Sequence, residues 1–307
     1  MKTPSANRQA AALMLSLWAL FLLSAMVISW ALDINGQITI SGAANRAFEA
    51  EAMACSGAEI ALHPAIKPGS PVLHGSIGRG QRYDVRITGE GGRLNLNWIL
   101  AGENPARKEI LRKYLENKGV DLNERDKMID CLLDWVDPDN LVRLNGAEEE
   151  GDYHPSNALL TRIEDLKKIR GWAEFTSTAD WDADLRIAEP IDLGRIDLVW
   201  ASRDVLLTLP GINEARVDQF LSLRRGADGI EATSDDTEFK TAEEALVALG
   251  YFGQQLAIVQ PLVVVNFPLF RVFSVGKSAD VKRIVQMVIQ KESGGRATLK
   301  PGTWKEL

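Results

Sequence analysis

The sequence predicts an α+β protein in which one long N-terminal helix packs on an antiparallel sheet and a helical domain is inserted between the strands. Three patterns indicate this fold. The chain begins with a long apolar and then amphipathic stretch. Segments that alternate with period two occur on both sides of its middle, and the middle itself, from about residue 105 to 256, has helical periodicity.

The N-terminal helix begins with an apolar segment. Residues 10–32 carry no charge, whereas Lys2 and Arg8 precede the segment and Asp33 follows it. About 20 apolar residues suffice for a helix to cross a bilayer, because a helix pairs its own backbone polar groups. The basic residues lie on the N-terminal side alone, which predicts that this end lies in the cytoplasm and the bulk of the chain outside.

A cleaved signal peptide is the alternative, since Ser29 and Ala31 can imitate a small-x-small cleavage site. The helical pattern nevertheless continues beyond the apolar segment, because apolar side chains recur at helical spacing as far as Leu62. No proline occurs between Pro4 and Pro64. One helix of roughly fifty residues, half in lipid and half on a soluble domain, accounts best for this region.

Composition sets further limits. The chain has 307 residues, 46% of them hydrophobic, and a net charge of -7. This acidic balance argues against a nucleic-acid-binding surface, which requires clustered Lys and Arg. The two cysteines, Cys55 and Cys131, lie in apolar helical patterns and are expected to be buried free thiols. A disulfide between them remains an alternative in an oxidising compartment.

The strand signals lie on either side of the helical block. Residues 64–80 are rich in Gly and Pro and are predicted to form a loop. Residues 83–87 alternate with period two, and residues 93–97 follow a Glu-Gly-Gly turn, which predicts a β-hairpin. After the helical block, residues 262–273 are β-branched and aromatic, residues 281–290 are a candidate strand, and residues 296–304 close the chain.

Six segments of the middle region have apolar residues at helical spacing. They are residues 110–115, 126–135, 157–169, 203–207, 213–223 and 242–249.

Two loops in this block are rich in carboxylates. Ca²⁺ requires six to eight oxygen ligands, and glycine permits the sharp turns that bring them together. The loop of residues 225–236 offers four acidic side chains within nine positions: Asp228, Glu231, Asp235 and Asp236. These carboxylates repel one another unless a cation or solvent screens them. A metal site and a solvated acidic turn are both open.

The loop of residues 134–148 is the second candidate. Asp137 and Asp139 flank Pro138. These two carboxylates also suit turn and helix-capping roles. Neither loop follows the EF-hand spacing.

Enzyme motifs are absent from the sequence. His63, His74 and His154 are scattered, and none lies in a metal-binding motif. There is no nucleophile elbow, and residues 75–80 resemble a phosphate loop by glycine count alone. We therefore expect no catalytic site.

A Leu-Pro-Gly-Ile turn at residues 209–212 lies between two predicted helices. Such a turn is typical of helix-hairpin-helix DNA-binding proteins. Here Glu214 and Asp218 follow it, and they would repel phosphate. The sequence therefore favours a structural turn, with a membrane-anchored DNA-uptake protein as the alternative function and an anchored enzyme as a third.

The order of these motifs resembles protein K of the type II secretion system, a minor pseudopilin, and the resemblance covers nearly the whole chain. The most specific match is residues 132–140 together with 145–148. The other matching segments are residues 12–20, 90–97, 209–212, 228–236 and 304–307.

The resemblance implies a pilin-like fold with an inserted SAM-like α-domain. Its expected divisions are a leader at residues 1–10, the N-terminal helix at 11–66 (transmembrane about 11–32), a pilin-like β part at 67–101 and 258–307, and two SAM-like helical parts at 102–190 and 191–257.

The resemblance also implies a function. The protein would be a non-enzymatic component of the tip of the periplasmic pseudopilus, anchored in inner-membrane lipid with its N-terminus cytoplasmic. It would contact minor pseudopilins I and J and other secretion-system components, but no nucleic acid. It would prime assembly and help to export folded proteins across the outer membrane. Ca²⁺ would bind in the α-domain, for which the candidate ligands are the six acidic residues named above.

The family's leader peptide is cut on the cytoplasmic side. Aligning Trp18 with the family's tryptophan places the cut between Ala10 and Ala11, although the peptidase prefers glycine at the position of Ala10. The fifth mature residue is then Leu15, where most pilins carry a glutamate that pairs with a neighbour's amine. A buried carboxylate without a partner is costly, so leucine suits a tip subunit, although any transmembrane anchor can carry leucine there.

Outside the membrane, the apolar stripe of the long helix is expected to pack on partner pseudopilin helices. The stripe consists of Phe48, Ala52, Cys55 and Leu62. Packing of the same residues on the protein's own sheet is the competing expectation, since one face cannot serve both contacts at one level.

We predict that the mature chain begins at Ala11 and keeps its apolar helix. The basis is the Trp18 alignment and the basic Lys2 and Arg8 before the cut. Mass spectrometry of the N-terminus of the purified protein tests this. A mature chain that starts near Ala31 would identify an ordinary signal peptide and would contradict the pseudopilin interpretation.

Overall fold

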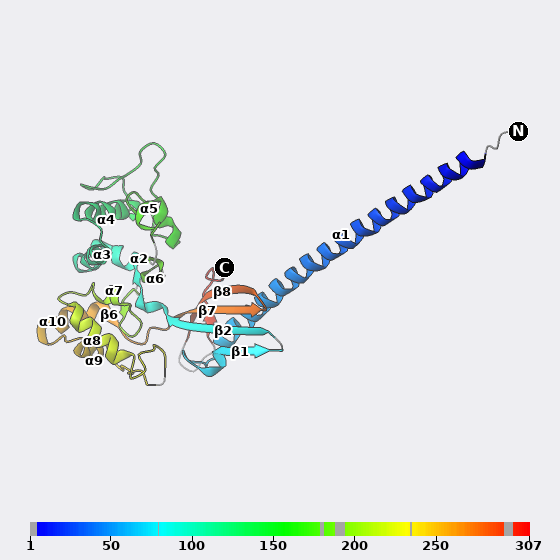
Figure 1. The fold of residues 1–307 in the computed structure, drawn as a ribbon. Helices are drawn as coiled ribbons and strands as arrows, with labels where there is room; N and C mark the ends of the chain where they lie inside the picture. Colours follow the sequence, from blue (N-terminus) through cyan, green and yellow to red (C-terminus); the bar gives the residue numbers. More distant parts are fainter. Residues whose placement is uncertain (1–4, 79, 179–180, 188–193, 234, 292–296) are drawn as a thin grey trace.

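The computed structural model describes residues 5–307 except 79, 179–180, 188–193, 234 and 292–296, and it describes side chains from residue 11 onward. A long N-terminal helix leads into an antiparallel sheet, and a lobe of shorter helices lies at the end of the molecule farthest from the N-terminus (Figure 1). The predicted α+β class with an inserted helical domain is confirmed.

Helix α1 spans Ser5–Ala61, which is 57 residues, or roughly 85 Å at the usual helical rise. Its first half projects away from the rest of the molecule (Figure 1). This helix is long and apolar enough to cross a membrane once, and the side chains of Leu15 and Trp18 on it are exposed. The first four residues of the expected leader lie outside the described part of the chain, and the cut after Ala10 stays a prediction.

A six-stranded sheet follows α1, and all of its strand pairs are antiparallel. Its order is β1-β2-β7-β8-β10, with β9 also paired to β8. The strands are β1 (His74–Ile77), β2 (Gln81–Gly89), β7 (Leu269–Ser278), β8 (Val281–Gln290), β9 (Thr298–Leu299) and β10 (Lys305–Glu306).

The sheet and α1 meet through small side chains. Ala50, Ala54, Ala58 and Ala61 recur at intervals of three and four residues and are completely buried. Opposite them, a Cβ at Gly276 of β7 would lie 1.9 Å from the carbonyl oxygen of Ala50. The backbones of α1 and β7 therefore lie closer together than a side chain at residue 276 would permit. The larger side chains of this core come from the strands, at alternating positions of β2, β7 and β8.

This packing separates the stripe that the sequence suggested. Phe48 and Ala52 are exposed, with 70% of Phe48 accessible to solvent. Cys55 and Leu62 are half-buried and lie against the core between α1 and the sheet. Residue 48 therefore does not belong to the protein's own core, and its face of α1 is open.

Two expectations about the strands are wrong. Residues 74–77 of the predicted loop form β1, which pairs with β2. The predicted hairpin of residues 83–97 does not form, because β2 pairs with β7 and β1, whereas β3 (Leu94–Asn95) pairs in parallel with β4 (Leu185–Arg186).

The glycines between β2 and β3 have another purpose than a hairpin turn. A Cβ at Gly91 would lie 2.6 Å from the side chain of Phe267, and one at Gly92 would lie 2.2 Å from the carbonyl oxygen of Trp200. These residues therefore permit a close contact with the helical lobe. A short 3₁₀ turn, η2 (Glu90–Gly92), carries the chain out of the sheet.

The helical lobe is inserted between the neighbouring strands β2 and β7 and has one continuous hydrophobic core. Its helices are α2 (Leu96–Leu100), α3 (Pro105–Asn117), α4 (Leu122–Val136), α5 (Trp172–Phe175), α6 (Trp181–Asp184), α7 (Arg203–Leu206), α8 (Glu214–Arg224), α9 (Ala242–Ala248) and α10 (Gly253–Val259). Its 3₁₀ turns are η3 (Ala101–Glu103), η4 (Ile163–Lys168) and η6 (Gln260–Leu262), whereas η1 (Pro71–Leu73) lies outside the lobe and precedes β1. A second parallel pair joins β5 (Ile196–Asp197) to β6 (Val263–Val264). The helix expected at residues 157–169 is wrong in its first half, where the left-handed backbone of Asn157 (φ 47°) precludes a helix.

A buried ion pair bridges β2 and β7 at the point where the lobe leaves the sheet. Glu90, at the end of β2, accepts two hydrogen bonds of 2.8 Å from Arg271 of β7, and Arg93 lies 3.3 Å from the same carboxylate. Burial raises the pKa of Glu90, and the charges of Arg271 and Arg186 oppose that rise. Removing one member of such a buried pair typically costs about 3–5 kcal/mol, so this pair fixes where the lobe begins.

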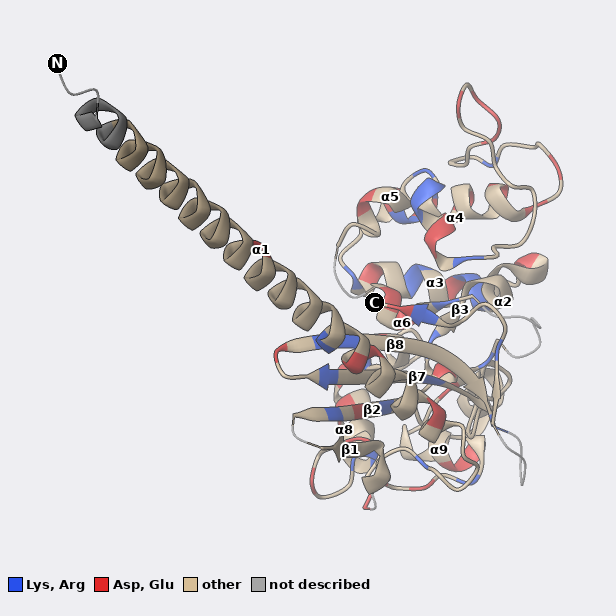
Figure 2. Cartoon of the chain, turned by 90° about the vertical axis from the view of Figure 1, so that its right-hand side faces the viewer, with Lys and Arg blue, Asp and Glu red and all other residues tan. Residues whose placement is uncertain are grey.

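The two parts of the molecule differ in charge. The sheet segments, residues 67–101 and 258–307, contain 13 Lys and Arg against 5 Asp and Glu, whereas residues 102–257 contain 19 against 33. Figure 2 shows basic residues on the strands and many acidic residues on the helices. The acidic character of the chain thus resides in the lobe.

We predict that Gly276→Ala destabilises the protein. The added methyl would overlap the backbone of α1, and overpacking of this kind typically costs 1–3 kcal/mol or more. Chemical denaturation of the full chain in detergent measures the change. Gly36→Ala is the matched control, because a Cβ there meets nothing within 4 Å and should leave stability unchanged or slightly higher. Equal stability of both variants would contradict the packing described here.

Candidate metal centre

Three carboxylates meet where α4 ends. Asp134 lies in the last turn of α4, Asp137 follows the helix directly, and Glu148 returns to the same place after the ten residues 138–147. One oxygen from each lies within 4.8 Å of the others. Asp134 is completely buried, and Glu148 is only 7% exposed. We call these three residues the helix-end cluster.

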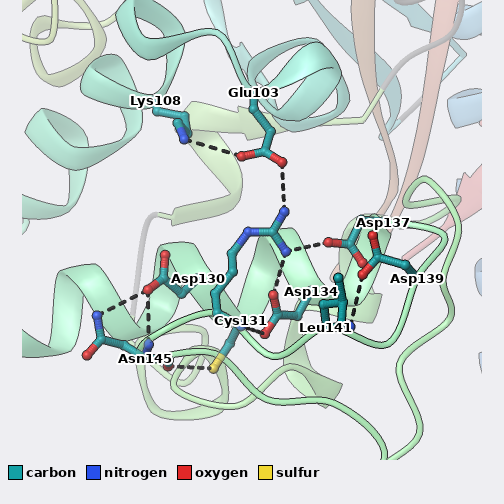
Figure 3. Close-up of polar contacts among 10 residues, drawn as sticks. Glu103, Lys108, Asp130, Cys131, Asp134, Asp137, Asp139, Leu141 and Asn145 are labelled. Atoms are coloured by element: carbon teal, nitrogen blue, oxygen red, sulfur yellow. Dashed lines mark hydrogen bonds and ion pairs between the residues drawn. The ribbon is translucent and has the colours of Figure 1, made fainter.

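Arg143, from the intervening loop, contacts this cluster. Its Nη1 lies 2.5 Å from Asp134 Oδ1 and also contacts Asp137 Oδ2, and its Nη2 lies 2.7 Å from Glu103 Oε1. Figure 3 shows Glu103, Asp134 and Asp137 around this guanidinium. Burial alone would lower the pKa of Arg143, but hydrogen bonds to the three carboxylates raise it. Arg143 is therefore a permanent cation here.

Glu148 lacks a comparable partner. Both of its carboxylate oxygens are buried and accept no hydrogen bond within the described part of the chain, and Asp137 Oδ1 is in the same state. Burial, followed by the charges of Asp134 and Asp137, raises the pKa of Glu148. A buried polar group without a partner is expensive, so these oxygens fit a ligand that supplies positive charge.

Further oxygen atoms lie beside Glu148. A cavity of about 110 Å³ is lined by Asn140, Glu148, Glu149, His154, Pro155 and Asn157. Asn157 Oδ1 is buried without a hydrogen-bond partner, while its Nδ2 donates to Asn140 at 3.0 Å. Carboxylate and amide oxygens are the donors that Ca²⁺ prefers, and the donor set therefore fits this ion.

The sequence identified this region and one of its three clustered carboxylates. Asp137 belongs to the cluster, whereas Asp139 does not, because its Oδ1 accepts the amide N–H of Leu141 at 2.9 Å and caps the turn (Figure 3). Asp134 and Glu148 were missed as candidates. Their burial is a tertiary property, and only the order Asn-Gly-Ala-Glu at residues 145–148 could have indicated it.

The second acidic loop brings together three of its four predicted ligands. Asp228, Asp235 and Asp236 each place one oxygen within 4.8 Å of the others. Their carboxylates are already hydrogen-bonded: Asp235 Oδ2 accepts the amide N–H of Ala227 at 2.7 Å, and its Oδ1 accepts the hydroxyl of Thr233. The hydroxyl and amide hydrogen bonds lower the pKa of Asp235. This loop holds its shape through its own backbone.

Glu231 lies apart from these three carboxylates. Its Oε1 accepts hydrogen bonds from Arg224 at 2.7 Å and from Arg225 at 3.1 Å. Arg224 is itself buried and also donates to the carbonyl oxygens of Leu198 and Ala201. Glu231 therefore neutralises a structural arginine, and it is not a member of the carboxylate group.

The Leu-Pro-Gly-Ile turn connects α7 to α8, as the sequence suggested. Arg203, the first residue of α7, is paired with Glu214 at 2.8 Å and with Asp218 at 2.7 Å. Asn213 caps α8 by accepting the amide N–H of Arg216. The basic side chain and a backbone amide next to the turn are thus engaged within the protein, which favours a structural role for the turn.

The two cysteines are free thiols. Cys131 is buried in α4, and burial raises its pKa to about 11. A thiol in this state is a packing group and a poor nucleophile.

The architecture defines a class of protein: a pilin-like fold, with one apolar helix long enough to cross a membrane and a helical lobe inserted into the sheet. The structure is similar to one chain in the crystal structure of the GspK-GspI-GspJ complex from the enterotoxigenic Escherichia coli type 2 secretion system. The similarity covers 89% of this chain and 99% of that chain. The TM-score is 0.61 and the sequence identity is 12%, so this similarity concerns the fold.

The sequence of the lobe is similar to that of known proteins. Residues 92–178 match the family model of the type II secretion system (T2SS), protein K. Type II secretion system protein K of Dickeya chrysanthemi is 29% identical over 69 residues, and that of Pectobacterium carotovorum subsp. carotovorum is 28% identical over 115 residues. These matches cover 22% and 33% of this chain, and the chain spans a fifth and a third of the length of those relatives.

Proposed function

We propose that this chain is a minor pseudopilin of the type II secretion system, that it lies at the tip of the periplasmic pseudopilus, and that it primes pseudopilus assembly. In this way it would help to export folded proteins across the outer membrane, as a mechanical component without catalytic activity. The observation that carries the proposal is the protein K match over residues 92–178, within a pilin-like fold.

The anchor supports a single-pass inner-membrane protein. α1 has one apolar segment, and Lys2 and Arg8 precede it. This charge distribution orients the N-terminus toward the cytoplasm and the sheet and lobe toward the periplasm. Inner-membrane lipid then surrounds the exposed apolar side chains of the segment.

The shape of the molecule supports the tip position. The lobe lies beyond the sheet, at the end farthest from the anchor (Figure 1). With Ala11 as the first mature residue, Leu15 stands where a subunit with a neighbour above would carry a carboxylate. An apolar residue there avoids an unpaired charge in the membrane.

We propose minor pseudopilins I and J as partners. The matched structure is that of a GspK-GspI-GspJ complex. On α1 of this chain, Phe48 and Ala52 are exposed on the part of the helix that follows the apolar segment. An exposed aromatic on a helix face is suited to packing against neighbouring helices.

We also propose that the lobe binds Ca²⁺. The helix-end cluster would bind one ion through Asp134, Asp137 and Glu148, and the loop of Asp228, Asp235 and Asp236 would bind a second. The buried, unpartnered oxygens of Glu148 make the first site the stronger candidate.

We predict that Glu148→Gln changes stability in opposite directions with and without calcium. In chelator, the substitution removes a buried charge that has no partner, and the melting temperature should rise. In calcium at a hundredfold excess over Kd, each bound ion stabilises the wild-type protein by about 2.7 kcal/mol. The variant should lose the stabilisation that comes from the ion in the helix-end cluster. Thermal melts of the full chain in detergent measure both changes.

Glu124→Gln is the matched control for this experiment, because Glu124 is exposed, lies in the first turn of α4 at the opposite end from the helix-end cluster, and pairs with Lys127 at 3.6 Å. It should keep the calcium-dependent rise. Identical melting temperatures with calcium and with chelator in the wild-type protein would contradict both proposed sites.

We predict that Phe48→Glu abolishes co-purification with minor pseudopilins I and J. Loss of a central aromatic at an interface typically costs about 2 kcal/mol or more. Because Phe48 is exposed in the isolated protein, its own stability should change by no more than about 0.5 kcal/mol. Pull-down from co-expressing cells and a thermal melt give the two readouts.

Ala43→Glu is the control, since residue 43 is also exposed and lies roughly 140° around the helix from Phe48. It should leave the complex intact. Unfolding of Phe48→Glu would place this residue in the protein's own core, and failure of the unmodified chain to bind either partner would disprove the assembly role.

A further inference from the structure

The helix-end cluster contains a built-in cation as well as its carboxylates. Arg143 bonds to one oxygen of Asp134 and one oxygen of Asp137. Its backbone N–H also donates to Asp134 Oδ2 at 3.3 Å. Its neighbours Leu141 and Leu144 are exposed to solvent. The side chain of Arg143 thus turns inward from a loop whose other large side chains point outward.

The guanidinium leaves part of the cluster free. It contacts Asp134 Oδ1 and Asp137 Oδ2, whereas Asp137 Oδ1 and both oxygens of Glu148 are buried and make no hydrogen bond within the described residues. Glu148 is more than nine-tenths buried and has an oxygen within 4.8 Å of the two aspartates. The free oxygens can therefore receive a cation while Arg143 keeps its contacts.

The charges of the site can be counted. Asp134, Asp137 and Glu148 supply three negative charges, and Arg143 supplies one positive charge. Glu103, which also contacts Arg143, is half exposed and pairs with Lys108 at 3.5 Å, so these two cancel. Asp139 and Glu149 lie outside the cluster and are exposed, so water screens their charges. The cluster and Arg143 together keep a charge of minus two, in surroundings where burial weakens this screening. A divalent cation neutralises this charge, and a trivalent one exceeds it.

We propose that Arg143 is the residue that sets the charge selectivity of this site, and that it matches the helix-end cluster to a divalent cation in preference to a trivalent one. It acts as a positioning residue as well, because it orients Asp134 and Asp137 while it lowers the negative charge of the site by one. This inference rests on the proposed calcium site and deepens it.

The test compares the affinities of the full chain in detergent for Ca²⁺ and Tb³⁺. All proteins carry Asp228→Asn and Asp235→Asn, which silence the other acidic loop. The measured quantity is the ratio of the two dissociation constants, from calorimetric titration. Glu148→Gln in the same background must lose binding of both ions, which assigns the signal to the helix-end cluster.

Arg143→Gln is expected to shift the ratio toward Tb³⁺ by about tenfold or more, because one unit of positive charge a few ångströms from the ion repels a trivalent cation more strongly. Arg143→Lys retains the charge and should keep the ratio within about threefold of the parent protein. Asp137→Asn removes one negative charge and should shift the ratio in the opposite direction, toward Ca²⁺, even where Arg143→Gln fails to fold.

Four results would overturn the inference. An unchanged ratio in Arg143→Gln, or no opposite shift in Asp137→Asn, would remove the charge argument alone and leave calcium binding intact. A lysine variant that behaves as the glutamine variant does would show that geometry, not charge, decides selectivity. Absence of any binding that is sensitive to Glu148→Gln would overturn the calcium proposal and this inference together.

Discussion

The close contact between α1 and the sheet is the constraint on which the rest of the structure depends. Small side chains on α1 and Gly276 on β7 let two backbones touch, so the position of the helix is fixed by van der Waals contact between backbones and not by flexible side chains. The large apolar side chains of β2, β7 and β8 then fill the remaining space. Everything that the chain carries beyond the sheet is positioned relative to this contact.

The lobe is attached to that frame at the ends of β2 and β7. The ion pair between Glu90 and Arg271 bridges these neighbouring strands at the point where the chain leaves the sheet and returns to it. At the same point, Gly91 packs against the side chain of Phe267, which lies on the segment that returns from the lobe to β7. The two acidic clusters therefore lie on a body that is joined to the sheet at two adjacent strands, while their carboxylates come from local loops and helix ends.

The sequence predicted most of the fold, because the long helix, the strands β7 and β8 and several helices of the lobe follow strong local periodicity. The hairpin at residues 83–97 was wrong because glycine marks both a turn and a close approach, and only the position of Phe267 distinguishes them. The candidate site was predicted in part for a similar reason. Asp137, Asp228, Asp235 and Asp236 are visible as acidic clusters, whereas Asp134 and Glu148 matter through burial, and Arg143 matters through contacts that no spacing rule encodes.

The packing of α1 on the sheet also determines the rotational orientation of this helix about its own axis. A helix held by backbone contact cannot rotate about its own axis without moving the sheet. α1 runs without a break from the apolar segment to the residues that pack on the sheet. The direction in which Phe48 points and the direction in which the lobe extends are therefore locked together. A neighbour that packs on the Phe48 face therefore fixes the direction in which the lobe points around the membrane normal. Rotation of the anchor about its own axis would rotate the sheet and the lobe with it.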